Sequence, residues 1–299
     1  MNIIGKYKNG NYCVTLLSDG TKIRETNDDE FIPSFAENCD VKITDKCDGG
    51  CPFCYEGCTA NGKHGDILNY EFLDTLHPYT ELAINGNDLS HPDLVPFMYK
   101  MKEKKIILNM TVNQIHFERH FNLIMDWIEE GLIYGLGVSL QNPTDEFIEK
   151  ITQYSNAVVH VINGVVSVHD LVRLAGHNIK ILILGYKYLR RGESYYEHND
   201  EIINTLQHDL DKYLFPQIIN NGWFNVVSFD NLAINQLNVQ KHIPEDQWEE
   251  FYMGSDSEFT FYIDMVDGTF GKNSLAPENE RFPIMDNIDD MFEKIRLKK

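Results

Sequence analysis

Short apolar runs alternate with helical stretches along most of this chain, and this alternation restricts the fold more than any other feature of the sequence. Strands that are apolar throughout and separated by helices are typical of parallel sheets covered by helices. The predicted strands are Val41–Thr44, Glu81–Ile84, Ile106–Thr111, Leu136–Leu140, Ala157–Val161, Ile179–Leu184 and Asn225–Phe229. Helical periodicity predicts helices at Leu94–Lys104, Phe117–Glu130, Thr144–Tyr154 and Val165–Leu174.

This order of elements fits an α/β fold, and six or seven such strands fit a partial (β/α)6 TIM-like barrel. In barrels of this kind the residues that bind and react lie at the C-terminal ends of the strands. Site residues are therefore expected where each predicted strand ends.

Both ends of the chain depart from the alternation. Residues 3–24 hold three short β segments separated by Asn-Gly and Asp-Gly turns, which predict a β meander. Residues 259–270 alternate around an Asp-Gly turn as in a β hairpin, and Ile284–Leu297 has the pattern of an amphipathic helix. We predict three segments: an N-terminal β meander and linker at 1–37, the barrel core at 38–231, and a C-terminal extension with the hairpin and helix at 232–299.

The charge balance argues against some partners. The chain has 46 acidic and 26 basic residues and a formal charge of −20, whereas proteins that bind nucleic acids usually present a basic face. The first residues show no secretory signal, and no segment approaches the roughly 20 apolar residues that span a bilayer. We expect a cytoplasmic protein without nucleic-acid or membrane partners, in which thiols stay reduced.

Three of the six cysteines form the stretch Cys47-Asp48-Gly49-Gly50-Cys51-Pro52-Phe53-Cys54, a C-x3-C-x2-C spacing. Closely spaced cysteines in a reducing compartment indicate metal or redox chemistry rather than disulfides. Iron–sulfur clusters are held by such thiolates, and the two glycines let a loop wrap tightly. Three ligands would leave one iron of a cubane cluster open to a substrate or cofactor.

The cysteine stretch resembles the signature of the radical S-adenosylmethionine superfamily, with the aromatic Phe53 just before the third cysteine. It follows the first predicted strand, as the cluster loop of that superfamily does, and the resemblance covers roughly residues 38–231. The resemblance implies a [4Fe–4S] cluster on Cys47, Cys51 and Cys54, with S-adenosylmethionine on the open iron. It also implies an electron donor such as flavodoxin or ferredoxin.

The activity implied by this resemblance is that of an oxygen-sensitive enzyme. One electron from the cluster cleaves S-adenosylmethionine to methionine and a 5′-deoxyadenosyl radical, which takes a hydrogen atom from the substrate. The reaction class stays open among oxidoreductase, transferase and isomerase types. A peptide or small-molecule substrate is favoured over a nucleic acid, because the chain is strongly acidic.

The end of the second predicted strand is where the superfamily usually has a Gly-Gly-Glu turn that meets the methionyl amine. Here the turn is Asn85-Gly86-Asn87-Asp88, with asparagine in place of the acid. An amide carbonyl of Asn87 or the carboxylate of Asp88 can accept a hydrogen bond from an ammonium group. The alternative is an Asn-Gly turn that binds no ligand.

Further residues are assigned to the cofactor site by the resemblance and by their place at strand ends. These are Phe53, Asn113, Ser139, His160, Asn163, Gly185 and Tyr186. His160 lies in an apolar run, so a buried core histidine is an equal alternative. Cys58 and Glu56 are possible catalytic residues. The segment 188–200 is predicted to be an insertion whose basic loop, with Arg190 and Arg191, either binds an anion or is solvated.

Two functions of other classes use the same residues. One is a structural or interaction module that binds zinc through Cys47, Cys51 and Cys54, with Cys58 or His64 as the fourth ligand. The other is a barrel that binds the cofactor without turnover, which the altered turn at residues 85–88 suggests. In the radical enzyme Cys58 is not a ligand, because a fourth thiolate would close the iron that the cofactor needs.

Overall fold

The computed structural model describes residues 2–297 and contains two β-sheets. A three-stranded antiparallel sheet has the order β1-β2-β3, and a ten-stranded sheet has the order β10-β9-β8-β7-β6-β5-β4-β11-β12-β13. The strands are β1 (Ile3–Asn9), β2 (Tyr12–Leu17), β3 (Lys22–Glu25), β4 (Asn38–Lys42), β5 (Glu81–Asn87), β6 (Ile107–Asn113), β7 (Gly135–Ser139), β8 (Ala157–Ile162), β9 (Lys180–Leu184), β10 (Val226–Phe229), β11 (Thr260–Asp264), β12 (Thr269–Gly271) and β13 (Phe282–Pro283).

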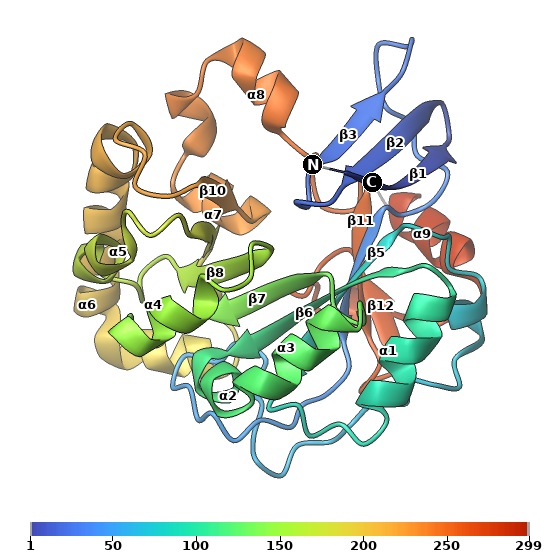
Figure 1. The fold of residues 1–299 in the computed structure, drawn as a ribbon, viewed down its shortest axis with the longest axis horizontal. Coiled ribbons are helices and arrows are strands. Elements are labelled where there is room, and N and C mark those ends of the chain that lie inside the picture. Colours follow the sequence, from blue (N-terminus) through green and yellow to red (C-terminus); the bar gives the residue numbers. More distant parts are fainter. Residues whose placement is uncertain (1, 298–299) are drawn as a thin grey trace.

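Strands β4 to β10 are parallel and neighbour one another in chain order, and β11 adds to the free side of β4. Since each right-handed crossover then steps in the same direction, the connecting helices all fall on one face of the sheet. Figure 1 shows α1 to α6 along this outer face. The helices are α1 (Leu94–Glu103), α2 (Gln114–Arg119), α3 (Phe121–Glu129), α4 (Asp145–Ile151), α5 (Val168–Leu174), α6 (Arg191–Tyr213), α7 (Asn231–Gln236), α8 (Glu245–Phe251) and α9 (Ile288–Arg296).

The predicted α/β class with a mostly parallel sheet is confirmed, and each of the seven predicted strands corresponds to a strand of this sheet. The N-terminal meander, the hairpin β11–β12 and the final helix α9 are also present. The hairpin is not a separate unit, because β11 pairs with β4 inside the large sheet.

Two segments differ from the sequence predictions. The stretch 117–130 is two helices, because His120 has non-helical dihedrals between α2 and α3, and the α2 turn begins earlier, where the Asn113 side chain accepts from the Ile115 amide. In the insertion predicted at 188–200 the basic loop is shorter than expected, since α6 begins at Arg191. Helical periodicity by itself does not reveal a break between two helices that bury the same side.

The strands of the large sheet alternate between two environments. In β6, Leu108, Met110 and Val112 are buried, while Asn109, Thr111 and Asn113 face a cavity on the other side. β5 has the same alternation. Side chains on successive strand residues point to opposite faces, so the helix-covered face forms the main apolar core and the other face carries polar groups.

The N-terminal meander closes the end of the sheet where the parallel strands begin. Tyr134 Oη donates to the carbonyl of Leu17 at 2.6 Å, and Asn156 Nδ2 donates to the carbonyl of Ser18 at 3.1 Å. Lys180 Nζ donates to the carbonyl of Asp19 at 3.0 Å. These three donors stand at the starts of β7, β8 and β9. The turn between β2 and β3 is therefore held against the main sheet by three consecutive carbonyls.

Replacing Lys180 by methionine should loosen this turn. A hydrogen bond from a charged donor contributes about 1.5–3 kcal/mol to stability, and its removal leaves the carbonyl acceptor partly buried without a partner. We expect faster amide hydrogen exchange at residues 17–21, measured by mass spectrometry. Lys241→Met is the control, since Lys241 is exposed and bonds only within its own turn. Equal exchange in both variants would show that the turn does not depend on Lys180.

Within the described residues, no helix is long and apolar enough to cross a membrane.

Candidate active site

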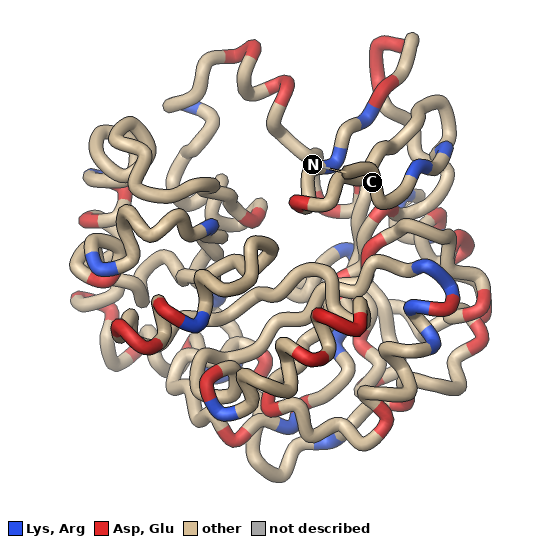
Figure 2. Tube along the Cα trace, viewed as in Figure 1, with Lys and Arg blue, Asp and Glu red and all other residues tan. Residues whose placement is uncertain are grey.

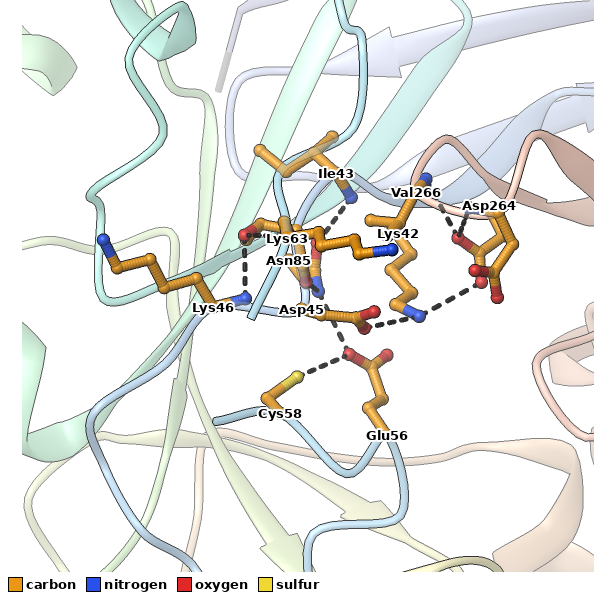
Figure 3. Close-up of polar contacts among 12 residues, drawn as sticks. Lys42, Ile43, Asp45, Lys46, Glu56, Cys58, Lys63, Asn85, Asp264 and Val266 are labelled. Atoms are coloured by element: carbon orange, nitrogen blue, oxygen red, sulfur yellow. Dashed lines mark hydrogen bonds and ion pairs between the residues drawn. The ribbon is translucent and has the colours of Figure 1, made fainter. Parts of the chain in front are cut away.

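The loop that carries the three cysteines leaves the end of β4 and is held by the end of β5. Asn85 Oδ1 accepts from the Ile43 amide at 2.7 Å, and Asn85 Nδ2 donates to the Thr44 carbonyl at 2.9 Å. Asn87 Nδ2 donates to the carbonyls of Thr44 and Lys46, both at 3.1 Å. Figure 3 shows Asn85 between the start of this loop and Glu56. The two asparagines therefore fix the path by which the chain leaves β4.

The cysteine loop is also anchored from outside the sheet. Asp48 pairs with His116 and, at 2.9 Å, with Arg119 of α2, and the His116 hydrogen bond lowers the pKa of Asp48 to about 2. A side chain on Gly49 would lie 3.3 Å from both Cys47 Sγ and the His116 ring, and Gly50 has a φ of +63°. Both glycines of the motif are thus needed for the loop to reverse direction in this space.

Cys47, Cys51 and Cys54 are partly exposed free thiols that line one cavity. Burial raises the pKa of Cys47 to about 11, whereas a hydrogen bond from Cys58 lowers the pKa of Cys54. Cys51 Sγ accepts from two side-chain amides, Asn113 Nδ2 at 3.3 Å and Gln141 Nε2 at 3.2 Å. Among the described residues no three His, Cys, Asp or Glu side chains are already arranged to hold a metal ion.

The donor set nevertheless fits an iron–sulfur cluster. Thiolates are the ligands that such clusters take, and the three thiols belong to one loop and face one space. Cys54 is biased towards the thiolate by its hydrogen bond from Cys58.

The cavity has a volume of about 1020 Å³ and extends from the cysteine loop to the turn between β2 and β3. This is at the upper end of the range of small-molecule sites, about 300–1,000 Å³. Its polar side chains come mainly from the inner face of the parallel strands. They include Asp40, Glu56, Asn85, Asn87, Asn109, Thr111, Asn113, Ser139, His160, Lys187 and Asp230.

Most of the residues predicted for the site line this cavity. They are Cys47, Cys51, Phe53, Cys54, Glu56, Cys58, Asn85, Asn87, Asn113, Ser139, His160, Gly185 and Tyr186. Three predicted residues are not among the lining residues: Gly86 is packed against Met110 and Val112, Asp88 accepts from Ser90 at 2.5 Å, and Asn163 donates to Gln236 at 3.1 Å.

Several predicted contacts are already engaged within the protein. Both polar atoms of the Asn85 amide bond the cysteine loop, and its Nδ2 also donates to Glu56 at 3.0 Å. The backbone N–H and C=O of Tyr186 both bond the Gln236 side chain, at 2.9 Å each, and the Gly185 amide donates to Asp230 at 2.9 Å. A cofactor that used these groups would have to share or displace those bonds.

Glu56 and Cys58, the possible catalytic residues, lie side by side. Cys58 Sγ is 3.6 Å from Glu56 Oε2 (Figure 3), and Tyr55 Oη donates to Glu56 Oε1 at 3.1 Å. Burial raises the pKa of Glu56, and hydrogen bonding with Cys54 raises the pKa of Cys58. Both groups are therefore biased towards their protonated forms.

His160 stands against Gly137, where an added side chain would meet its ring at 2.4 Å. Burial lowers its pKa from 6.5 to about 4, so His160 is neutral at pH 7. As pH falls below 6.5, His160 becomes protonated in the unfolded chain but stays neutral in the folded protein. The free energy of unfolding therefore decreases between pH 6.5 and about pH 4.

We expect the His160→Gln variant to lose part of this acid sensitivity. The free energy of unfolding of the wild type should fall by up to about 3 kcal/mol more than that of the variant between pH 6.5 and 4, at about 1.36 kcal/mol per pKa unit. Urea unfolding at several pH values measures this. His208→Gln, which alters an exposed histidine, should follow the wild type; parallel curves for His160→Gln would contradict the prediction.

Gln141 is a site residue that the sequence did not single out, and Arg191, predicted to bind an anion or to be solvated, acts beside the cysteine loop. Gln141 follows the end of β7 by two residues, and its amide reaches Cys51. Arg191 begins α6, and its charge lowers the pKa of Cys54 after the larger effect of Cys58. The position of Gln141 just after a strand end was a usable signal, whereas the position of Arg191 depends on how α6 docks.

No protein-family model and no curated protein matches this chain. Among solved structures it is similar to Streptococcus suis SuiB bound to S-adenosylmethionine, with a TM-score of 0.55 and 15% identity over 89% of this chain and 66% of SuiB. It is also similar to SuiB bound to the precursor peptide SuiA, with a TM-score of 0.51 and 15% identity over 80% of this chain and 60% of SuiB.

At this identity the likeness shows the fold alone: the chain shares the fold of SuiB. The α/β architecture expected from the sequence is thus also found in a protein that was crystallised with S-adenosylmethionine. In both comparisons the chain spans less than two thirds of the length of SuiB.

Proposed function

We propose that this protein is a radical S-adenosylmethionine enzyme that holds a [4Fe–4S] cluster on Cys47, Cys51 and Cys54. The observation that carries the proposal is the position of these three thiols. They have the characteristic spacing, they lie in the loop that follows β4, and they face a cavity lined by the ends of parallel strands. Together the cluster and S-adenosylmethionine supply one-electron cleavage of the sulfonium and abstraction of a hydrogen atom from the substrate. We further propose that β4 to β9 form the partial barrel of the superfamily, between the meander and the C-terminal extension.

The residues of the chain bind and orient the cofactor. Ser139 and His160 offer a hydroxyl and a neutral imidazole to the ribose, adenine or carboxylate. Phe53 closes one wall of the cavity next to Cys54. The Asn87 carbonyl is the group we assign to the methionyl amine, since its Nδ2 is already committed to the loop carbonyls.

We favour a peptide as the substrate. SuiB has been crystallised with a precursor peptide, and the cavity here lies at the upper end of the size range of small-molecule sites. Figure 2 shows basic residues scattered among acidic ones along the chain, which disfavours a nucleic acid. The electron would come from a donor such as flavodoxin or ferredoxin, in the cytoplasm.

Anaerobic reconstitution with iron and sulfide tests the proposal. We expect brown protein that converts S-adenosylmethionine to 5′-deoxyadenosine when reduced with dithionite, measured by liquid chromatography. Colourless protein that contains zinc would support the structural zinc module instead. Cluster-loaded protein that binds S-adenosylmethionine without forming 5′-deoxyadenosine would support a barrel without turnover. That alternative is favoured by Asn85, because both polar atoms of its amide already bond within the protein.

A further inference from the structure

The N-terminus of α6 packs directly on the cysteine loop. A side chain on Gly192 would come within 3.4 Å of the Phe53 carbonyl and 2.3 Å of the Lys187 carbonyl, so glycine allows this close approach. One turn further on, the ring of Tyr195 meets the ring of Phe53 edge-on at 6.0 Å between centroids. Since Phe53 lies between the second and third cysteines, the first turn of α6 is fixed against the part of the loop that holds Cys51 and Cys54.

The two arginines at the start of α6 have different surroundings. Arg190 donates from Nη1 to the Glu56 carbonyl and packs on Gly57, where a side chain would lie 3.1 Å from its Cδ. Arg191 Nε is buried and has no hydrogen-bond partner among the described residues. No carboxylate of the described residues lies within ion-pairing distance of Arg191. Its positive charge is therefore uncompensated beside the cysteine loop.

Two neutral donors reach Cys51 in the same loop. Gln141 Nε2 donates to Cys51 Sγ at 3.2 Å. Asn113 Nδ2 is a second donor to the same sulfur, at 3.3 Å. Cys51 thus receives hydrogen bonds from the end of β6 and from just after β7, while the start of α6 brings the charge of Arg191 to the loop that holds Cys51.

We propose that Asn113, Gln141 and Arg191 set the reduction potential of the cluster through Cys51. The inference rests on the proposed function, since it requires a cluster at these cysteines. Hydrogen bonds to cluster sulfurs and nearby positive charge stabilise the state that carries one more electron. A cluster held by these cysteines would take one electron from its donor, and Asn113, Gln141 and Arg191 would face the added negative charge. They are positioning residues, because they act through a ligand and not on the substrate.

Arg191→Gln is the main test, with the midpoint potential of the reconstituted cluster measured by electron paramagnetic resonance during a redox titration. We expect the ratio of reduced to oxidised cluster at a fixed potential to fall about tenfold, which for one electron is a shift of about 59 mV to lower potential. Arg191→Lys keeps the charge and should recover most of the shift. Gln141→Met removes one donor to Cys51 and should lower the potential in the same direction.

Arg173→Gln is the matched control, since Arg173 pairs with Asp145 on the surface of α5 and the substitution removes the same charge. A shift in Arg191→Gln no larger than in Arg173→Gln would overturn the inference, as would an unchanged potential in Gln141→Met. If the Arg191→Gln protein does not load a cluster, the potential of Gln141→Met decides. The Gln141 side chain is exposed, so this substitution should leave the fold and cluster loading intact. Failure of the wild type itself to assemble a cluster would instead overturn the proposed function.

Discussion

In the proposed enzyme, replacing Cys51 by alanine should remove the cluster and with it the cleavage of S-adenosylmethionine. Three thiolates are the smallest set that holds a cubane cluster with one open iron, and Cys51 is the one that receives two amide hydrogen bonds. Replacing a residue that only supports a metal ligand lowers metal affinity or activity about 10- to 100-fold. The loss of a ligand itself should therefore lower 5′-deoxyadenosine formation by more than about 100-fold. Iron and sulfide content, the absorbance near 400 nm and product chromatography measure the outcome.

The other cysteines provide the controls for this experiment. Cys13 is exposed on β2, and Cys13→Ala should retain the cluster and the activity. Cys58→Ala separates the two metal hypotheses, because a four-cysteine zinc site needs Cys58 whereas the radical enzyme does not. Normal iron content and turnover in Cys51→Ala would refute the assignment of the cluster ligands.

Replacing Lys42 by methionine should destabilise the fold strongly. Lys42 is 2% exposed, and its Nζ lies 2.6 Å from Asp45 Oδ1 and 3.2 Å from Asp264 Oδ2 (Figure 3). Burial lowers the pKa of Lys42, but the Asp45 hydrogen bond and the Asp264 charge outweigh it and raise the pKa. The lysine therefore joins β4 to β11 as a buried cation.

Removal of one partner from a buried ion pair leaves the other charge without compensation and costs about 3–5 kcal/mol. We expect a loss of this size in the free energy of unfolding of Lys42→Met, measured with urea. Asp264 keeps Arg281 at 3.4 Å, which should hold the loss to the lower end of the range. Combining Lys42→Met with Asp264→Asn should restore part of the stability, since the uncompensated charge is then removed.

The matched control is Lys150→Met, which breaks the exposed i,i+4 pair with Glu146 at 2.7 Å on α4. Such surface pairs contribute about 0.3–0.5 kcal/mol. If Lys42→Met and Lys150→Met lost the same stability, the buried network would not be what joins the C-terminal hairpin to the sheet.

The strands were predictable because fully apolar or alternating runs between helices admit few other structures. Asn85, Asn87 and Asn113 were predicted as site residues, but Asn109 and Thr111 inside β6 were not, because Asn and Thr within a strand resemble loop residues. The break at His120 and the early start of α6 were missed for a similar reason: both depend on capping and docking rather than on periodicity.

Within the candidate site, the cysteine ligands could be inferred from spacing alone, since a loop of eight residues brings its own thiols together. The roles of Asn85 and Asn87 were harder to infer. The sequence places them where a cofactor contact is expected, but their amide groups hold the cysteine loop. An asparagine at a strand end can bond to a ligand or to the backbone, and only the neighbouring chain decides between them.

The sequence by itself determined the class of fold and the loop from which chemistry would begin. Only the tertiary structure decided what surrounds Cys51: Asn113 lies 62 residues away along the chain, Gln141 lies 90 residues away, and Arg191 arrives with α6. Local patterns record how a segment buries its own apolar side. Contacts at such separations depend on sheet register and on how a helix docks, and no local pattern records either.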